Sequence, residues 1–572
     1  MKRTIMHGLL AALCLALAFP LAAQSAAEEK IELPDVTTVV TGDTLTAGKE
    51  AIPDYSSVLP TAESGKIELP SLEKPEPKAA AASPVQAASQ SGEKTVYAEG
   101  ELGGGFPFLF LGDFAIYRAT GNAPFSLSFT HRSAEDFADN KAQDGFFART
   151  TAVGAVQSLN TERTENSFSA SYDTADFGLQ SLSTPYFDMV NHTISLKEDS
   201  RFSLPYGWFI TVGTDAAWYN RYGGSKSGSS DYYDADGNAI NLNPDDVTSH
   251  TVTFDLSPRF GFGWQNDMFK AGFTAQYQAQ GNLGDGNNFY KYDASTYRNA
   301  THRGEFGVNA AVSTKHAVFR GDVAIVVGSA LGKPALIAPF TVGTDLFIPY
   351  DEETNRVVKL TLEGGLDSYQ ATVRELEKMY RYSYAAVLPS ETTEWYGKAE
   401  ISVPLFESLS ANADATFRKT AFENGVWQAD YTGSRDSTSA LYLLLNEERT
   451  DLETNLGVTF DWNGISYTAA WEAHWLDVPS LEEEHALLFS AAYQSAGDRY
   501  TLEASYKQAL GSDADLAPNL GASATLRASQ TLRLALEAND IVKLCAATTR
   551  AYAHSAYKAE SGSIALLVKF QF

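Results

Sequence analysis

The feature that most constrains this chain is the strict alternation of apolar and polar residues from about Thr95 to the C-terminus. Between Phe269 and Ala279, for example, every second residue is aromatic or alanine, and the residues between them are polar or glycine. A period of two places alternate side chains on opposite faces of a strand. We therefore expect an all-β fold whose strands have one apolar face and one polar face.

A hairpin is predicted around Asn463-Gly464, the residue pair that most favours a two-residue turn. Apolar residues alternate over 456–462 before this turn and over 465–475 after it, and the opposite face includes Glu472 and His474. The apolar face would form the core of a soluble sandwich, or it would face lipid in a membrane barrel. Alternation alone does not distinguish these two folds.

The layout of the connectors does distinguish them. About 22 segments of roughly ten residues follow Thr95, which is the length that a tilted strand needs to cross a bilayer. Short turns follow the even-numbered segments, and long polar connectors follow the odd-numbered ones. The long connectors lie near 133–159, 223–248, 281–301, 368–391, 421–450 and 541–561. This layout predicts a transmembrane antiparallel β-barrel of about 22 strands over residues 95–572.

Composition excludes several other classes of protein. The net charge is −28, with 43 Lys and Arg against 71 Asp and Glu, so the basic surface that nucleic-acid binding requires is absent. The only conspicuous apolar run is N-terminal, which excludes a helical membrane protein. Cys14 lies in that run and Cys545 is the only other cysteine, so the mature chain is expected to have no internal disulfide and no zinc site.

The first 94 residues are predicted to be separate from the barrel. Residues 1–25 have the pattern of a secretory signal peptide, with Lys2 and Arg3 before an apolar stretch and small residues at its end. Residues 26–94 are rich in Ala, Pro, Ser, Glu and Lys, so we predict a disordered periplasmic extension. The sequence Lys-Ile-Glu-Leu-Pro occurs in it twice, at 30–34 and 66–70, which is compatible with a proline-stiffened spacer.

One segment of this extension is β-prone and suited to adding a strand to the sheet edge of a partner. It consists of Asp35, Val36, Thr37, Thr38, Val39, Val40 and Thr41. At the other end of the chain, a last strand alternates and finishes on an aromatic residue. Its predicted outer face consists of Ile564, Leu566, Val568, Phe570 and Phe572.

Taken together, these segments resemble the barrel part of a TonB-dependent outer-membrane receptor. Residues 35–41 are similar to the Ton box, residues 97–105 resemble the glycine-rich first strand, and residues 534–540 and 561–572 resemble the last two strands. The resemblance implies a barrel in outer-membrane lipid, a TonB-like periplasmic partner at residues 35–41, and recognition of the last strand by the barrel-assembly machinery. The family's plug domain is missing, because only about fifty residues separate Gly42 from Thr95.

The missing plug raises a physical question, because the lumen of a 22-strand barrel is too wide for side chains to fill. Three elements are candidates for narrowing it: long loops folded inward, the N-terminal extension, or a separate plug protein. Val373, Leu376 and Met379 predict a short amphipathic helix within 371–380, either packed in the lumen or capping it.

No catalytic, cofactor or metal site is predicted. The histidines are scattered, and neither a G-x-S-x-G nor an H-E-x-x-H pattern occurs. Residues 231–238 are acidic but lack the spacing of an EF-hand calcium loop. Glu472 and His474 share a strand face, either as a proton pair or as ordinary polar lining. The acidic composition favours cations or neutral solutes over anions.

We therefore expect a non-enzymatic barrel in the outer membrane that mediates passage or uptake of a small solute and is energised through a TonB-like partner. The alternative is a surface-exposed scaffold or adhesin whose long loops bind external partners. Loops at one rim of the barrel suit both functions.

Overall fold

The computed structural model describes residues 96–119, 123–135, 147–225, 232–233, 239–240, 250–283, 300–330, 333–351, 356–511, 517–560 and 562–572. All of them belong to one unit of the chain, Pro60–Phe572. The predicted signal peptide, the extension and the Ton-box-like segment lie outside the described residues.

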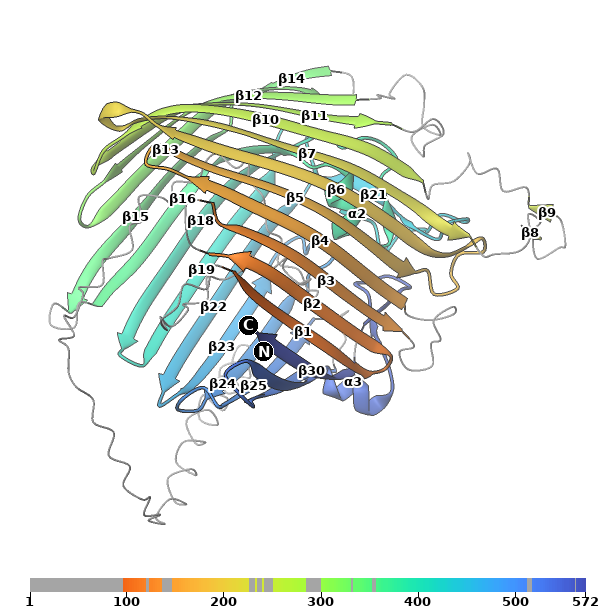
Figure 1. The fold of residues 1–572 in the computed structure, drawn as a ribbon. Coiled ribbons are helices and arrows are strands. Elements are labelled where there is room, and N and C mark those ends of the chain that lie inside the picture. Colours follow the sequence, from red (N-terminus) through yellow and green to blue (C-terminus); the bar gives the residue numbers. More distant parts are fainter. Residues whose placement is uncertain are drawn as a thin grey trace, which may run out of the picture. The chain divides into compact units, whose positions relative to one another are not determined.

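The strands form a closed antiparallel barrel of 22 strands (Figure 1). Each strand pairs with the next along the chain, and β1 pairs with β30 from Glu99 opposite Gln571 to Phe106 opposite Ile564. The expected fold class is thus confirmed. The wall strands are β1 (Tyr97–Phe106), β2 (Leu109–Arg118), β3 (Phe125–Glu135), β4 (Phe147–Asn160), β5 (Thr164–Gly178), β6 (Tyr186–Ser203), β7 (Trp208–Ser225), β10 (Thr251–Gln265), β11 (Phe269–Asn282), β12 (Ala300–Ser313), β13 (Ala317–Ala330), β15 (Phe340–Asp351), β16 (Arg356–Gln370), β18 (Glu391–Phe406), β19 (Leu409–Thr420), β22 (Thr450–Trp462), β23 (Ile465–His474), β24 (His485–Gln494), β25 (Tyr500–Leu510), β26 (Asn519–Arg527), β27 (Leu532–Asn539) and β30 (Ser563–Gln571).

A further short strand, β14 (Lys333–Ile337), continues the line of β15. Val326 of β13 lies opposite Ile337, and Val323 lies opposite Phe340, so β14 and β15 pair with β13 in one register. Pro339 interrupts the strand between them, because proline has no N–H to donate to the ladder. The two segments therefore form one wall strand with a break.

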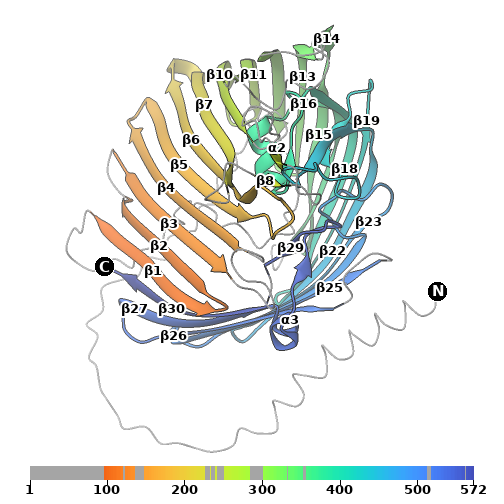
Figure 2. The ribbon, with the colours of Figure 1, turned by 90° about the vertical axis from the view of Figure 1, so that its right-hand side faces the viewer.

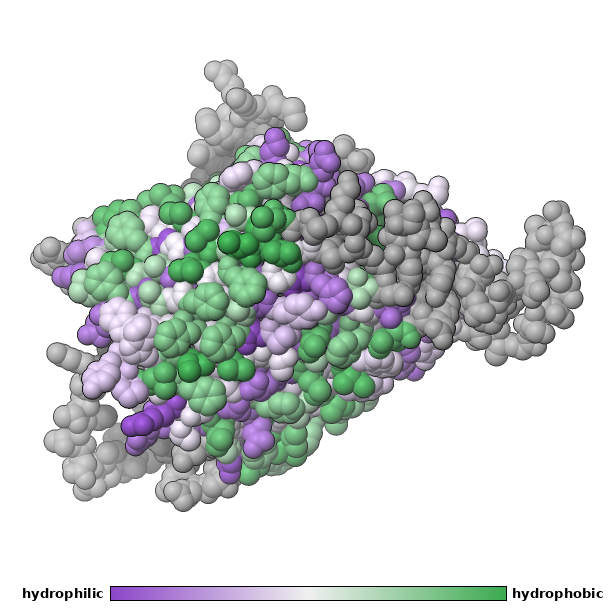
Figure 3. Space-filling view, turned by 90° about the horizontal axis from the view of Figure 1, so that it is seen from above, coloured by the Kyte–Doolittle hydropathy of each residue, from purple (hydrophilic) through white to green (hydrophobic). Residues whose placement is uncertain are grey.

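The apolar face of the wall points outward. On β11, Phe269, Phe273 and Tyr277 are 40–44% exposed, although they are the most apolar residues of the strand. Apolar side chains gather over the outer surface of the barrel (Figure 3). A surface of this kind is stable against lipid and costly against water. The alternative of a soluble sandwich is therefore excluded.

The predicted hairpin is confirmed. Asn463 and Gly464 have φ angles of 49° and 82°, as a type I′ turn requires. β22 and β23 pair around them from Trp462 opposite Ile465 to Glu453 opposite His474.

The connectors divide between two rims. We call the end of the barrel at which β3, β5, β7, β11, β16, β19, β23 and β27 end the long-connector rim, and connectors 179–185, 371–390, 421–449, 475–484 and 540–562 start there. The turns at 161–163, 266–268, 314–316 and 463–464 lie at the opposite, short-turn rim. The predicted alternation is confirmed, but the predicted bounds of 133–159 are wrong. β4 begins at Phe147, because its alternating residues continue to pair with β3.

Glycine in the first strand has a steric reason. A Cβ atom on Gly105 would lie 2.0 Å from the carbonyl oxygen of Ile564, and one on Gly103 would lie 2.4 Å from a Leu567 methyl group. These glycines allow β1 and β30 to approach at the seam where the barrel closes.

The remaining elements are short. They are η2 (Pro205–Gly207), α2 (Val373–Met379), α3 (Ile541–Ala546), β8 (Tyr232–Tyr233), β9 (Ala239–Ile240), β17 (Ser383–Tyr384), β20 (Val426–Ala429), β21 (Tyr442–Glu447), β28 (Arg550–Ala551) and β29 (Lys558–Ala559). Among the described residues, none of the helices has the length and apolarity that crossing a membrane would require.

Candidate functional site

Connectors from the long-connector rim fold into the lumen. The wall strands surround α2 (Figure 2). The predicted helix at 371–380 is confirmed as α2, and Val373 and Leu376 are buried. Thr372 caps it, because its Oγ1 accepts from Glu375 N at 3.2 Å while Glu375 Oε2 accepts from Thr372 N at 3.0 Å. A capped helix of seven residues needs tertiary packing to persist.

A small sheet joins two of these connectors. β17, in the connector 371–390, pairs in parallel with β21 through Ser383 opposite Tyr442, and β20 pairs antiparallel with β21. β20 and β21 belong to the connector 421–449. The two connectors therefore fold as one unit, although they are separated in sequence by β18 and β19.

Tyrosine rings extend this unit to a third connector, 540–562. Tyr382 stacks on Tyr557 with ring centroids 3.7 Å apart, and the Tyr557 hydroxyl donates to Ala440 O at 3.0 Å. Tyr552 meets Tyr382 edge to face, with ring centroids 5.0 Å apart. In addition, Gln180 from connector 179–185 donates to the Lys558 carbonyl at 2.9 Å. Buried tyrosines of this kind combine apolar packing with a satisfied hydroxyl.

We call this unit the connector core and define it by its buried apolar residues. They are Leu179, Val373, Leu376, Tyr380, Tyr382, Ala385, Leu388, Trp427, Ala429, Tyr431, Leu441, Tyr442, Leu444, Tyr552 and Tyr557.

On one side the connector core packs on apolar wall residues. Leu109 of β2, Ala134 of β3, Phe177 of β5, Met189 of β6 and Ala565 of β30 are all buried in the same cluster. Each lies at the end of its strand that meets the long-connector rim. We call this side the apolar anchor.

On the other side the contacts are charged. Glu377 of α2 lies 3.2 Å from Arg221 of β7, and both side chains are at most 1% exposed. Glu377 also accepts from the Tyr219 hydroxyl at 3.0 Å. Arg374 of α2 donates to Asp255 of β10 at 3.1 Å. Arginine and carboxylate pairs withstand burial only when such additional hydrogen bonds satisfy them.

A third charged pair, which is buried, lies where β18 follows the connector 371–390. Arg303 of β12 donates to Glu391 Oε1 at 2.9 Å and to the Ser368 carbonyl at 2.7 Å. We call the inner faces of β7, β10, β11 and β12, which carry these pairs, the polar wall.

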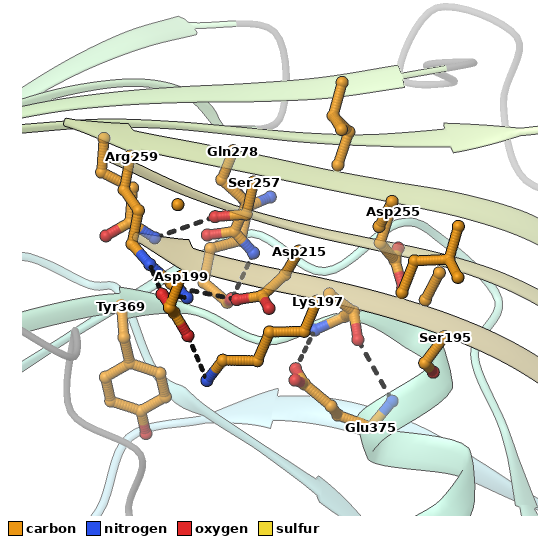
Figure 4. A pocket seen from close by; sticks show the side chains of 18 of the residues that line it. Ser195, Lys197, Asp199, Asp215, Asp255, Ser257, Arg259, Gln278, Tyr369 and Glu375 are labelled. Carbon is orange, nitrogen blue, oxygen red and sulfur yellow. Dashed lines mark hydrogen bonds and ion pairs between the residues drawn. The ribbon is translucent and has the colours of Figure 1, made fainter. Parts of the chain in front are cut away.

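A cavity of about 1050 Å³ extends from α2 towards the short-turn rim (Figure 4). Its lining reaches from Arg374 and Lys378 on α2 to Asn160 and Glu165 beside the turn 161–163. The cationic residues that line it are Lys197, Arg201, Arg259, Arg374, Lys378 and Arg449.

Anionic residues line the cavity in equal number. They are Glu165, Asp199, Asp215, Asp255, Glu305 and Glu375.

Several of these charges pair with one another across the cavity wall. Arg259 donates to Asp215 at 2.7 Å and to Asp199 at 2.5 Å, as Figure 4 shows. Lys197 lies 3.5 Å from Asp199. Much of the remaining lining is hydroxyl or amide, as at Ser257 and Gln278. The cationic and anionic residues that line the cavity are therefore equal in number, although the whole chain carries −28.

The structure does not bring the residues that the sequence singled out into one site. Glu472 and His474 both belong to β23, but His474 Nδ1 lies 3.2 Å from Asp451 of β22, a partner that was not predicted. Most of the acidic segment 231–238 lies outside the described residues. No group of three potential metal ligands occurs in the part of the chain that is described.

Sequence reasoning did not find the tyrosine cluster, Arg221 or Glu377. Nothing in the local sequence distinguishes these residues from polar lining, because their partners lie more than a hundred residues away. Only Val373 and Leu376 gave a local indication, through their helical spacing.

The comparisons with known proteins agree with this fold. No family model matches the chain, and no curated protein matches it in sequence. The barrel has the fold of the TonB-dependent receptors, as the resemblance implied. At 9–11% sequence identity the similarity concerns the fold alone.

Three solved structures illustrate the similarity. The FrpB iron transporter from Neisseria meningitidis (F3-3 variant) has a TM-score of 0.61 at 9% identity, covering 84% of this chain and 82% of that one. The copper transporter OprC has 0.59 at 10%, covering 85% and 81%. A mutant ferric enterobactin receptor, PfeA, from Pseudomonas aeruginosa in complex with enterobactin has 0.58 at 11%, covering 85% and 82%.

Proposed function

We propose that this chain is an outer-membrane barrel for the uptake of a small solute, and that its own connector core gates the lumen. The observation that carries the proposal is the burial of α2 inside the barrel, with Glu377 paired to Arg221 and Leu376 in an apolar cluster. Such packing answers the question that a wide lumen without a plug raises.

We propose that the long-connector rim is extracellular and the short-turn rim periplasmic. Both described ends of the chain support this orientation, because Phe572 N donates to Ala98 O at 2.7 Å beside the short-turn rim. An extension that precedes residue 96 then starts on the periplasmic side, where a TonB-like protein is available.

The proposed coupling uses Asp35 to Thr41, which would add a strand to the partner's sheet. Deleting these residues is expected to abolish energised uptake in cells while leaving the conductance of the purified barrel unchanged. Unchanged uptake would contradict the coupling without contradicting the gate.

We also propose that the outer face of β30 directs barrel assembly. Ile564, Leu566 and Val568 are exposed to the outside, and so is Phe572. Deleting Phe572 is expected to lower the amount of assembled barrel in the outer membrane, measured against Phe422→Ala, which changes an exposed aromatic residue of a connector. Equal amounts for both variants would contradict this role.

The test of the gate is single-channel conductance in planar bilayers. Full-length protein is compared with a variant in which residues 372–388 are replaced by a Gly/Ser linker. We expect rare openings from the full-length protein and large, stable steps from the variant, because the linker cannot rebuild the connector core. Silence from both proteins, together with loop-dependent adhesion of cells, would instead support the surface scaffold.

A further inference from the structure

The two sides of the connector core differ in their contacts with the barrel wall. One side is closely packed, and the other contains buried polar atoms without hydrogen-bond partners among the described residues. At the apolar anchor, Ala134 is 0% exposed, Met189 1% and Ala565 2%, so packing there is close. Closely packed apolar contacts lose dispersion and hydrophobic energy as soon as they separate. The anchor therefore resists displacement.

The polar wall contains buried polar atoms that have no hydrogen-bond partner among the described residues. Arg221 is 1% exposed, and neither its Nε nor its Nη2 has a hydrogen-bond partner among the described residues. The same holds for Thr253 Oγ1, Gln280 Oε1 and Thr301 Oγ1, on the inner faces of β10, β11 and β12. Buried polar atoms are normally paired, so this row of groups retains capacity to bind something else.

The same strands line part of the cavity. Its lining includes Asp255 and Ser257 of β10 and Gln278 of β11, which continue the polar wall towards the short-turn rim. Separation of α2 from the polar wall would therefore connect the long-connector rim with the cavity along one continuous polar surface.

We propose that the solute path runs between α2 and the polar wall, and that it takes uncharged, hydrogen-bonding solutes. This inference rests on the proposed uptake function and adds the route and the class of solute to it. The connector core stays on the apolar anchor while the pairs of Glu377 with Arg221 and of Arg374 with Asp255 separate.

The balance of charges in the cavity determines the class of solute. A lining with one dominant sign concentrates ions of the opposite sign and excludes like ones. Here Arg259 compensates Asp199 and Asp215, and hydroxyl and amide groups occupy much of the rest. Such a surface offers donors and acceptors to a polyhydroxylated or amide-bearing solute without attracting a net charge.

The route is tested by cysteine labelling of the full-length protein in proteoliposomes, in a Cys545→Ser background. Thr253→Cys on the polar wall and Ala134→Cys on the apolar anchor are matched, since both positions are 0% exposed. A membrane-impermeant maleimide is applied with and without Glu377→Gln, which leaves Arg221 buried beside a neutral group.

We expect Glu377→Gln to raise the labelling rate of Thr253→Cys by at least about tenfold and to leave that of Ala134→Cys unchanged. A matched control is Asp345→Asn, which breaks an ion pair between wall strands, with Arg320 at 2.6 Å, and should not raise labelling. Labelling of Ala134→Cys in place of Thr253→Cys would overturn the route.

The solute class is tested on the same Glu377→Gln barrel. We expect a K⁺ to Cl⁻ permeability ratio between about 0.5 and 2, and proteoliposome swelling with raffinose but not with sucrose octasulfate. Adding Arg259→Gln should raise the permeability ratio at least about threefold, because it leaves Asp215 without its cationic partner and Asp199 with Lys197 alone. A strongly cation-selective or anion-selective Glu377→Gln barrel would overturn the solute class and leave the route standing.

Failure of the inference is distinguishable from failure of the proposed function. If Glu377→Gln stays closed while the linker variant of 372–388 conducts, the proposed path between α2 and the polar wall is wrong, but the proposal that the connector core gates the lumen stands. If neither variant conducts, the uptake function itself is contradicted.

Discussion

The barrel carries two apolar surfaces of different origin. The outer face consists of residues such as Phe273, Val323 and Leu566, which alternate along single strands and are exposed. The connector core consists of residues such as Tyr382, Leu441 and Tyr557, which come from separate connectors and are buried. The first surface is exposed and suited to a lipid environment, whereas the residues of the second surface pack against one another.

This difference determines how strongly a substitution in each surface affects stability. Each residue of the outer face makes similar contacts with the surrounding lipid. A single substitution there therefore changes the free energy of unfolding modestly, by an amount that depends on its depth in the bilayer. The connector core is closely packed, so removal of one aromatic side chain leaves a cavity. Four predictions use this contrast.

The largest effect is expected for Tyr557→Ala. The change removes the stack on Tyr382 and the hydrogen bond to Ala440, and it is expected to destabilise the connector core by about 3–5 kcal/mol. Protease sensitivity of the connectors and single-channel openings should both increase while the β-sheet circular dichroism is retained. Tyr493→Ala, at an exposed outer position, serves as the control. Loss of the barrel itself would show that the two surfaces are not independent.

A smaller effect is expected for Val323→Arg. Val323 lies midway along β13 and points outward with 52% exposure, so the charge meets lipid and should cost about 2–4 kcal/mol. Unfolding in urea from lipid vesicles measures it. Asn309→Arg on the inner face, opposite Asp322, should cost much less, and equal costs would contradict the assignment of the outer face.

The connector core should depend on pH, whereas the outer face should not. Burial raises the pKa of Glu482 to about 7 from 4.5 in connector 475–484, whose Leu481 packs against the connector core. Because the folded state holds this proton more tightly than the unfolded state, stability is greatest below pH 4.5 and decreases as the pH rises towards 7. Connector proteolysis should therefore be slower at pH 5 than at pH 8 relative to Glu482→Gln. The same pH dependence in both proteins would contradict the role of Glu482.

The smallest effect is expected for Gly464→Ala in the hairpin turn. Its φ of 82° is unfavourable for alanine, and a Cβ atom would lie 2.7 Å from Gln494 O. We expect a loss of about 1 kcal/mol in barrel stability and no change in connector proteolysis. Greater connector exposure would mean that strain at the short-turn rim reaches the connector core.

Much of the barrel wall could be predicted from the sequence, because neighbouring residues determine its strands and turns. The alternation around Phe273 and the turn at Asn463-Gly464 specify strand, face and turn from neighbouring residues alone. The bounds of β4 were less predictable, because its pairing with β3 begins at Phe147, inside the segment that was assigned to a connector. The roles of the segments 35–41 and 564–572 stay predictions.

The connector core was predictable only in part. Helical spacing indicated α2, but the pairing of Glu377 with Arg221 and of Tyr382 with Tyr557 joins residues far apart in the chain. Likewise, the charge of −28 favoured cations or neutral solutes over anions, whereas the cavity lining carries cationic and anionic residues in equal number, because compensation depends on which side chains meet across strands.

The sequence by itself determined a barrel with an apolar outer face, because a period of two assigns each side chain to one face and the alternation of short and long connectors indicates strands that cross a bilayer. The tertiary structure alone decided how the connectors pack inside the barrel. That packing depends on tyrosines, arginines and carboxylates that acquire partners only when strands distant in sequence close into a ring.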